Sequence, residues 1–504
     1  MNRSMIGYIL GYILKIEAIL LLLPCAVGAI YQEREILAYL IVALLCALFG
    51  ILLSLHKPKS SVFYLKEGCA ATVLSWIFLS LFGCLPFVIT GEIPSFTDAL
   101  FETISGFTTT GASILSDVEA LSYCSLFWRS FTHWIGGMGV LVFLLAIIPL
   151  SGGSHINLMR AESPGPSVGK LVPKLRTTAR ILYIIYFALT VVEVLLLLAG
   201  KMSLFDALTT SFGTAGTGGF GIKNDSLAGY SIYIQWVVTI FMILFGVNFN
   251  AYYLLLFRKF RKAFGMEEVR YYILIIAASI AIIFFEIWNS TMSAVEALTH
   301  SSFQVASIIT TTGFSTIDFD NWSQACKSVL VLLMFVGACA GSTGGGIKVS
   351  RFVILIKTVS KELNSYIHPK SIKKIKMDKK PIEHEVVRSV NVYFITFMII
   401  FSASVFLISF EGKDLVTNFT AVAATINNIG PGLEMVGPSR NFGDFCVASK
   451  YVLMFDMLAG RLELFPLLIL FHPAFIRDFL KRQKRKENSS KTCVRQMECG
   501  KNSK

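Results

Sequence analysis

The sequence predicts an all-α polytopic membrane protein in which two leading helices precede four helix–pore loop–helix repeats around a pseudo-fourfold pore. Three observations predict this class. The 504 residues are 54% hydrophobic and only 15% charged, against about 25% charged in soluble domains. Ten apolar stretches approach the length of a membrane-spanning helix. A polar segment rich in Thr and Gly recurs four times between pairs of these stretches.

The apolar stretches exclude a soluble globular protein, because a helix crosses a bilayer with about 20 apolar residues. The clearest stretches cover residues 37–55, 181–199, 271–287, 390–409 and 451–471. The first stretch, 5–30, ends in CAVGA like a signal peptide, but it is long and is interrupted by Lys15 and Glu17. We therefore expect a retained first helix.

The stretches divide the chain into six predicted parts. These are two leading transmembrane helices in 1–60, pore repeats in 66–160, 175–262, 270–360 and 386–475, and a basic cytoplasmic tail in 476–504.

The net charge of +13 gathers in alternate connections. Residues 351–388 carry ten Lys or Arg and the tail after Pro473 carries ten more, whereas 91–125 hold five acidic residues and no Lys or Arg. Basic connections mark the cytoplasmic side, so both termini are predicted to be cytoplasmic. The charge thus indicates topology, with contact to membrane lipid or a soluble partner, and not nucleic-acid binding.

The four recurring segments share one order of residue types. They read DALFETISGFTTTGAS (98–113), DALTTSFGTAGTGGFG (206–221), EALTHSSFQVASIITTTGFS (296–315) and DLVTNFTAVAATINNIGPG (414–432). Each begins with an acidic residue, which favours a helix start, and the third is about one helical turn longer than the first two. Each is too short and polar to cross the membrane, so we expect four re-entrant loops that line one pore.

The ends of these segments suit a dehydrated alkali cation. Rings of backbone carbonyls replace the hydration shell of such an ion, and glycine lets the backbone turn successive carbonyls inward. The predicted potassium-binding filter comprises Thr109, Thr110, Gly111, Thr217, Gly218, Gly219, Thr311, Thr312, Gly313, Asn428, Ile429 and Gly430. In the second segment Gly218 and Gly219 compete, and the 13-residue spacing from Asp206 favours Gly219. The alternative, that these glycines are only turn residues, would fit a single Thr-Gly better than four.

These motifs resemble the TrkH family of bacterial potassium uptake proteins, within the Trk/Ktr/HKT superfamily. The similarity runs from Lys66 to about Pro473 and includes TTTGAS, TGGFG, TTTGFST, NNIGPGLE, WIGGMGVLVF (134–143), GSTGGGIKVSR (341–351) and AGRLELFP (459–466). The two leading helices favour TrkH over the shorter Ktr type. One departure is Thr217, where we expect a bulkier apolar residue before the paired glycines.

The resemblance implies a multi-pass protein of the bacterial inner membrane that forms a homodimer. It also implies a cytosolic nucleotide-binding regulator of the TrkA type. The transported ligand would be K⁺, with Rb⁺ and Na⁺ as further candidate ions, and no covalently bound cofactor is expected.

A second predicted element is a gate beneath the filter. Residues 341–346, here called the glycine loop, interrupt an apolar stretch, and three successive glycines disfavour helix by about 1 kcal/mol each. The resemblance makes this loop an intramembrane obstruction. The predicted gate residues are Gly341, Gly344, Gly345, Gly346, Lys348 and Arg461. The resemblance implies that Arg461 faces the conduction path; the alternative is a buried ion pair with Asp456 or Glu463.

Two other functions stay open as alternatives. One is a sodium-permeable or ion-coupled member of the same superfamily, such as a symporter; in its plant branch a Ser at the first filter glycine accompanies sodium preference, so Gly111 favours potassium. The other is a membrane-bound enzyme that uses His133 or His300. Their spacing matches no metal motif, and we expect both to be packing or interfacial residues. An enzyme is therefore not expected.

Overall fold

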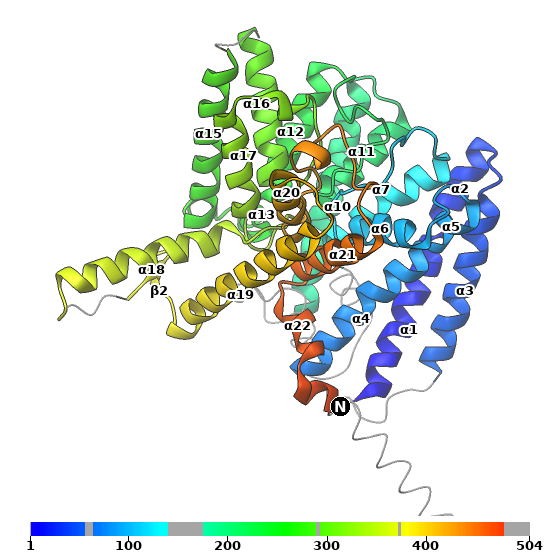
Figure 1. Cartoon of the computed structure of the whole chain (residues 1–504), viewed down its shortest axis with the longest axis horizontal. Coiled ribbons are helices and arrows are strands. Elements are labelled where there is room, and N and C mark those ends of the chain that lie inside the picture. Colours follow the sequence, from blue (N-terminus) through cyan, green and yellow to red (C-terminus); the bar gives the residue numbers. More distant parts are fainter. Residues whose placement is uncertain (1, 56–63, 140–174, 289–292, 371–373, 478–504) are drawn as a thin grey trace, which may run out of the picture.

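Helices dominate the part of the chain that a computed structural model describes, which is residues 2–55, 64–139, 175–288, 293–370 and 374–477 (Figure 1). The predicted all-α class is confirmed. The two short strands in this part, β1 (Lys376–Met377) and β2 (Lys380–Pro381), pair as a small antiparallel hairpin. The predicted basic tail lies almost wholly outside the described residues, as does the end of the first predicted repeat.

The helices follow the predicted order. The leading helices are α1 (Arg3–Leu20), α2 (Leu22–Tyr31) and α3 (Ile36–Ser54). They are followed by α4 (Leu65–Gly83), α5 (Leu85–Thr90), α6 (Phe96–Phe107) and α7 (Tyr123–Gly137), and then by α10 (Leu175–Ala199), α11 (Leu204–Gly216), α12 (Ile232–Gly246), α13 (Phe249–Leu256) and α14 (Phe260–Ala263). Next come α15 (Glu267–Trp288), α16 (Ala294–Ile309), η1 (Phe319–Asn321), α17 (Gln324–Val336) and α18 (Val349–Ile367). The last are α19 (His384–Ser409), α20 (Leu415–Ile426), η2 (Glu434–Val436), α21 (Val447–Arg461) and α22 (Phe465–Phe471).

Continuous membrane spans are fewer than the ten expected. Among the described residues, six helical spans are long and apolar enough to cross a bilayer, or seven if the bent pair α12–α13 counts as one. The others break. The α12–α13 pair bends by 91°, and residues 337–348 separate α17 from α18. The predicted continuous span 451–471 is wrong, because α21 and α22 are separate helices, with left-handed backbone at Glu463 and Leu464 between them.

Four short helices, α6, α11, α16 and α20, are the pore helices, and all begin alike. Ser95, Ser203, Ser293 and Asp414 are their N-caps, and each side chain accepts a hydrogen bond from the amide three residues on. Hydrogen bonds from the side chain and amide of Ser293 hold the pKa of the Glu296 carboxyl below its usual range. The extra turn predicted for the third segment is present, since α16 has 16 residues and α6 has 12.

The pore helices lie inside the molecule, and the long spans surround them. Most residues of α6, α16 and α20 are buried, whereas α3, α15 and α19 expose large side chains such as Leu44, Leu274 and Phe406. Exposed apolar side chains on long helices are typical of surfaces that face lipid. In Figure 1, α1–α3 stand at one flank, α18 and α19 project at the other, and α20 and α21 lie between.

Candidate functional site

The four pore helices end with the same backbone turn. The amides of Thr110, Gly218, Thr312 and Ile429 each donate to the carbonyl oxygen five residues back, at 2.8–2.9 Å. This 6→1 bond usually has glycine at the left-handed position. Here that position is held by Thr109 (φ 55°), Thr217 (φ 54°), Thr311 (φ 60°) and Asn428 (φ 56°). Four non-glycine residues in this rare conformation, at equivalent places, indicate a functional constraint on the backbone.

A second left-handed residue follows two positions later in every segment, and it is always glycine. The φ angles are 77° at Gly111, 75° at Gly219, 88° at Gly313 and 98° at Gly430. This places Gly219, and not Gly218, at the position equivalent to the other three glycines. We call segments 109–111, 217–219, 311–313 and 428–430 the filter ring.

The filter ring closes through contacts between neighbouring segments. A Cβ atom on Gly111 would overlap the carbonyl oxygen of Gly218, and one on Gly219 would overlap that of Thr312. Likewise a Cβ on Gly313 would overlap the carbonyl oxygen of Ile429. The fourth segment contacts the first, because a Cβ on Gly430 would lie 2.8 Å from the carbonyl oxygen of Thr110. The backbones of the four segments therefore touch in the order one, two, three, four, one, and no side chain fits at the four contacts.

Side-chain hydrogen bonds stiffen the filter ring from behind. The hydroxyls of Thr108 and Thr110 lie 2.8 Å apart, and those of Thr310 and Thr312 lie 2.7 Å apart. Asn428 Nδ2 donates to Thr110 Oγ1 at 2.9 Å, which joins the fourth segment to the first. Within the described part of the chain, Thr109 Oγ1 and Asn428 Oδ1 are buried and have no hydrogen-bond partner. Such oxygens are available to a cation.

The glycine loop is unwound and lies against the filter ring. The amide of Gly345 donates to Thr311 Oγ1 at 2.6 Å. A Cβ on Gly344 would lie 2.9 Å from the carbonyl oxygen of Thr310, and one on Gly345 would overlap that of Asn427. Gly341, Gly346 and Lys348 have left-handed backbones. The loop thus contacts the carbonyl ends of the third and fourth pore helices.

Two basic residues hold this loop. Lys348 Nζ donates to the carbonyl oxygens of Gly344 and Gly345. Arg461 Nη1 donates to the carbonyl oxygen of Thr343 at 2.9 Å, and its Nη2 donates to those of Gly136 and Gly137 at 2.5 and 2.8 Å. Arg461 therefore joins the end of α7 to the glycine loop.

The two acidic groups considered as alternative partners of Arg461 have other partners among the described residues. Glu463 forms its ion pair with Arg351, and Asp456 accepts a hydrogen bond from Ser404 Oγ at 2.8 Å. Asp456, Arg461 and Glu463 are close in sequence. However, α21 ends at Arg461, and Glu463 beyond it pairs with Arg351 of α18.

Glu268 was missed by sequence reasoning, although it anchors both sides of the glycine loop. Its Oε1 accepts from the amide of Ala340 at 2.6 Å and from that of Ser350 at 3.2 Å. Asn248 Nδ2 donates to its Oε2 at 3.3 Å. The available signal was a carboxylate at the start of an apolar span, where an unpaired charge is costly.

Arg129 and Glu102 were also missed, and they join the first two segments beyond the filter ring. Arg129 Nε lies 2.5 Å from Glu102 Oε1, and both side chains are buried. Arg129 Nη1 also donates to the carbonyl oxygen of Gly221 at 2.7 Å. Glu102 Oε2 accepts from the amide of Ile114 at 3.0 Å. Because both buried side chains also hydrogen-bond to the backbone, this ion pair holds the first two segments in a defined geometry.

Comparisons with known proteins agree with this architecture over nearly the whole chain. The family model TrkH, described as a cation transport protein, matches residues 37–480. The chain belongs to the TrkH family. It is 35% identical to the Trk system potassium uptake protein TrkH of Escherichia coli over 489 residues, which cover 95% of this chain and all of that protein. It is 32% identical to TrkG of the same organism over 486 residues, with the same coverage.

A solved structure of a TrkH family member has the same fold. The crystal structure of the potassium transporter TrkH from Vibrio parahaemolyticus aligns with a TM-score of 0.85 at 31% identity and covers 94% of this chain and all of that one. This TrkH family chain is therefore a multi-pass membrane transport protein and not an enzyme. His300, the other histidine considered in the sequence, has its Nδ1 2.9 Å from Thr316 Oγ1.

Proposed function

We propose that this TrkH family chain takes up potassium across the bacterial cytoplasmic membrane, with ions passing through the filter ring. The observation that carries the proposal is the closed ring of four segments, each with left-handed residues at the same two positions. The similarity to potassium uptake proteins and to a potassium transporter supports the choice of ion.

The proposed mechanism relies on backbone oxygens and helix ends. All four pore helices end at the filter ring, where their partially negative carbonyl ends favour a cation. The carbonyl groups of the ring would replace water around the ion, and Thr109 Oγ1 and Asn428 Oδ1 add unbonded oxygens nearby. The glycine loop, held by Lys348 and Arg461, would obstruct the path on the inner side.

A serine at Gly313 tests the proposed filter. Its Cβ would overlap the carbonyl oxygen of Ile429, so Gly313→Ser should reduce the preference for rubidium over sodium by about tenfold in proteoliposomes. Gly412→Ser is the matched control, because Gly412 also has a left-handed backbone (φ 79°) but no atom within 4 Å of an added Cβ. If sodium competes with rubidium equally in the wild type and in Gly313→Ser, this segment is not part of the filter.

The ion preference and the coupling need separate measurements. Gly111 supports potassium over the sodium-permeable alternative, because a Ser at this position accompanies sodium preference in the plant branch of the superfamily. A reversal potential that follows the potassium gradient alone indicates a channel. A reversal potential that also shifts with the proton or sodium gradient indicates the sodium-permeable or ion-coupled alternative.

The proposal extends to partners and placement. We propose a homodimer in the inner membrane with both termini cytoplasmic, and a cytosolic nucleotide-binding regulator on the basic connections. The connection 258–270 and the basic stretch 351–388 lie largely within the described residues, whereas 151–174 lies outside them. Nucleotide should leave rubidium flux through the purified chain unchanged until the regulator is added. A nucleotide response of the chain alone would contradict this partner.

A further inference from the structure

His133 uses both ring nitrogens between the first pore helix and the second filter segment. Its Nδ1 lies 2.7 Å from the carbonyl oxygen of Gly106, near the end of α6. The amide of Phe220 donates to its Nε2 at 3.2 Å. A carbonyl only accepts and an amide only donates, so these partners assign the neutral ring with its proton on Nδ1. The side chain is fully buried, so water does not compete for either bond.

The ring of His133 occupies a space that a side chain fills in the other three segments. The residue before each filter glycine is Thr110, Thr312 or Ile429 in segments one, three and four, but it is Gly218 in segment two. A Cβ on Gly218 would overlap the Cγ and Nδ1 atoms of His133. The imidazole and the missing side chain are therefore complementary.

The second filter segment needs such support from outside. Glycine has the greatest backbone freedom, and this segment has two glycines in succession. Thr110 and Thr312 restrain their own segments through hydroxyl contacts, and Gly218 has no equivalent group. His133 bonds the residue after Gly219, and its ring packs 4.3 Å from that of Phe220.

We propose that His133 is a positioning residue for the second filter segment, with its imidazole in place of the side chain that Gly218 lacks. The inference rests on the proposed function of the filter ring. Because Gly219 lies between the two points that His133 contacts, loss of the imidazole should loosen the carbonyl orientation there and with it the ion preference.

Four variants and one control variant test this proposal by rubidium uptake with sodium competition. His133→Leu removes both hydrogen bonds and should lower the preference for rubidium over sodium by about three- to tenfold. His133→Gln keeps one donor and one acceptor and should recover part of the loss. Gly218→Thr alone should lower uptake because it overlaps the imidazole, and His133→Ala together with Gly218→Thr should recover both uptake and preference. His300→Leu, a histidine variant on another pore helix, should keep the wild-type preference.

The outcomes separate this inference from the proposed filter. Wild-type preference in His133→Leu, together with a loss in Gly313→Ser, overturns the role of His133 and leaves the filter standing. Wild-type preference in both variants overturns the filter itself. If His133→Leu does not fold, the double variant decides: preference closer to wild type than in Gly218→Thr supports the role, and no recovery overturns it.

Discussion

The guanidinium group of Arg461 lies 2.9 Å from the carbonyl oxygen of Thr343, so the end of α21 holds the glycine loop directly. The same group also bonds the carbonyl oxygens of Gly136 and Gly137, at the end of α7. A positive charge is thereby joined directly to an unwound loop that contacts the filter ring. The proposed obstruction is one connected unit contributed by three repeats.

Removing the guanidinium of Arg461 should raise ion flux. Arg461→Ala removes a positive charge from a path with an effective dielectric constant near 20, which should lower the barrier by about 1–2 kcal/mol and speed flux roughly five- to thirtyfold. The preference for rubidium over sodium should stay the same, because the carbonyl oxygens that Arg461 binds belong to Gly136, Gly137 and Thr343, which lie outside the filter ring. Rubidium flux in proteoliposomes measures both, with Arg440→Ala, an exposed arginine, as control. A folded Arg461→Ala protein with wild-type flux would show that this arginine does not restrict the path.

The pair between Arg351 and Glu463 should matter for stability. These side chains are 5% and 14% exposed, and the Arg351 guanidinium also lies 4.0 Å from the Tyr393 ring centre. Glu463→Gln leaves a buried arginine without its carboxylate, so the free energy of unfolding should fall by about 3–5 kcal/mol. Thermal unfolding in detergent measures this change.

A more exposed pair serves as control for that prediction. Lys357 and Glu267 are 28% and 21% exposed, so Glu267→Gln should change the free energy of unfolding by about 1 kcal/mol at most. Equal effects of the two substitutions would mean that burial does not set the contribution of Glu463.

Local features of the fold could be predicted from the sequence because they depend on nearby residues. Each pore helix has a capping residue, an acidic residue at or just after its start and a glycine soon after its end, all within one short segment. The break between α21 and α22 was missed even though Pro466 lies in the first turn of α22, where proline commonly starts a helix. Pro466 falls inside the span expected to be continuous.

Contacts between distant segments could not be predicted, and they define much of the site. His133 looked like a packing residue because its partners, Gly106 and Phe220, are 27 and 87 residues away. The alternative partners considered for Arg461 were its neighbours in sequence, whereas the carbonyl oxygens that it binds lie 118 residues away or more. Backbone carbonyls carry no signature in the sequence, so a side chain that binds them cannot be matched to a partner beforehand.

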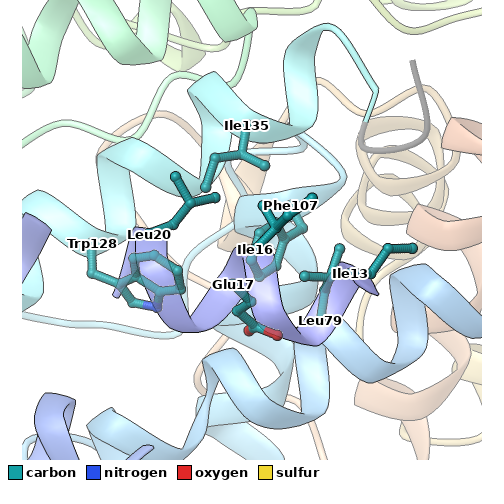
Figure 2. Close-up of a pocket in the computed structure, with 8 residues that line it drawn as sticks. All are labelled: Ile13, Ile16, Glu17, Leu20, Leu79, Phe107, Trp128 and Ile135. Atoms are coloured by element: carbon teal, nitrogen blue, oxygen red, sulfur yellow. The ribbon is translucent and has the colours of Figure 1, made fainter. Parts of the chain in front are cut away.

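Replacing Glu17 should stabilise the protein. Glu17 on α1 is 1% exposed, and within the described part of the chain neither carboxylate oxygen has a hydrogen-bond partner. Glu17 lines a cavity with Leu79, Phe107 and Trp128 (Figure 2). The volume of this cavity is about 10 Å³, which is room for about one water molecule. Glu17→Leu removes an unsatisfied polar group, so the free energy of unfolding should rise by about 1–3 kcal/mol.

The control for Glu17 is a carboxylate that has partners. Glu33, just after α2, accepts from the amides of Tyr123 and Cys124 at 2.6 and 2.9 Å, so Glu33→Leu should lower stability. Thermal unfolding in detergent compares the two variants. A fall in stability in Glu17→Leu would mean that its carboxyl group is satisfied in the membrane.

Shortening the glycine loop should raise flux and should make Arg461 irrelevant to it. Deleting 343–345 removes the carbonyl oxygen that Arg461 binds and the amide that binds Thr311. The rest of the loop should then no longer be held against the filter ring. Ion preference should stay at the wild-type value. Because the loop holds the guanidinium group in place, the deletion should also release the charge from the path. Arg461→Ala should therefore raise the rubidium flux of the deletion variant by a smaller factor than it raises the flux of the wild type. Thr343→Ala is the control, since it keeps the carbonyl group and should leave flux close to wild type. If the deletion and Arg461→Ala multiply in rubidium flux, the charge and the loop act as independent barriers.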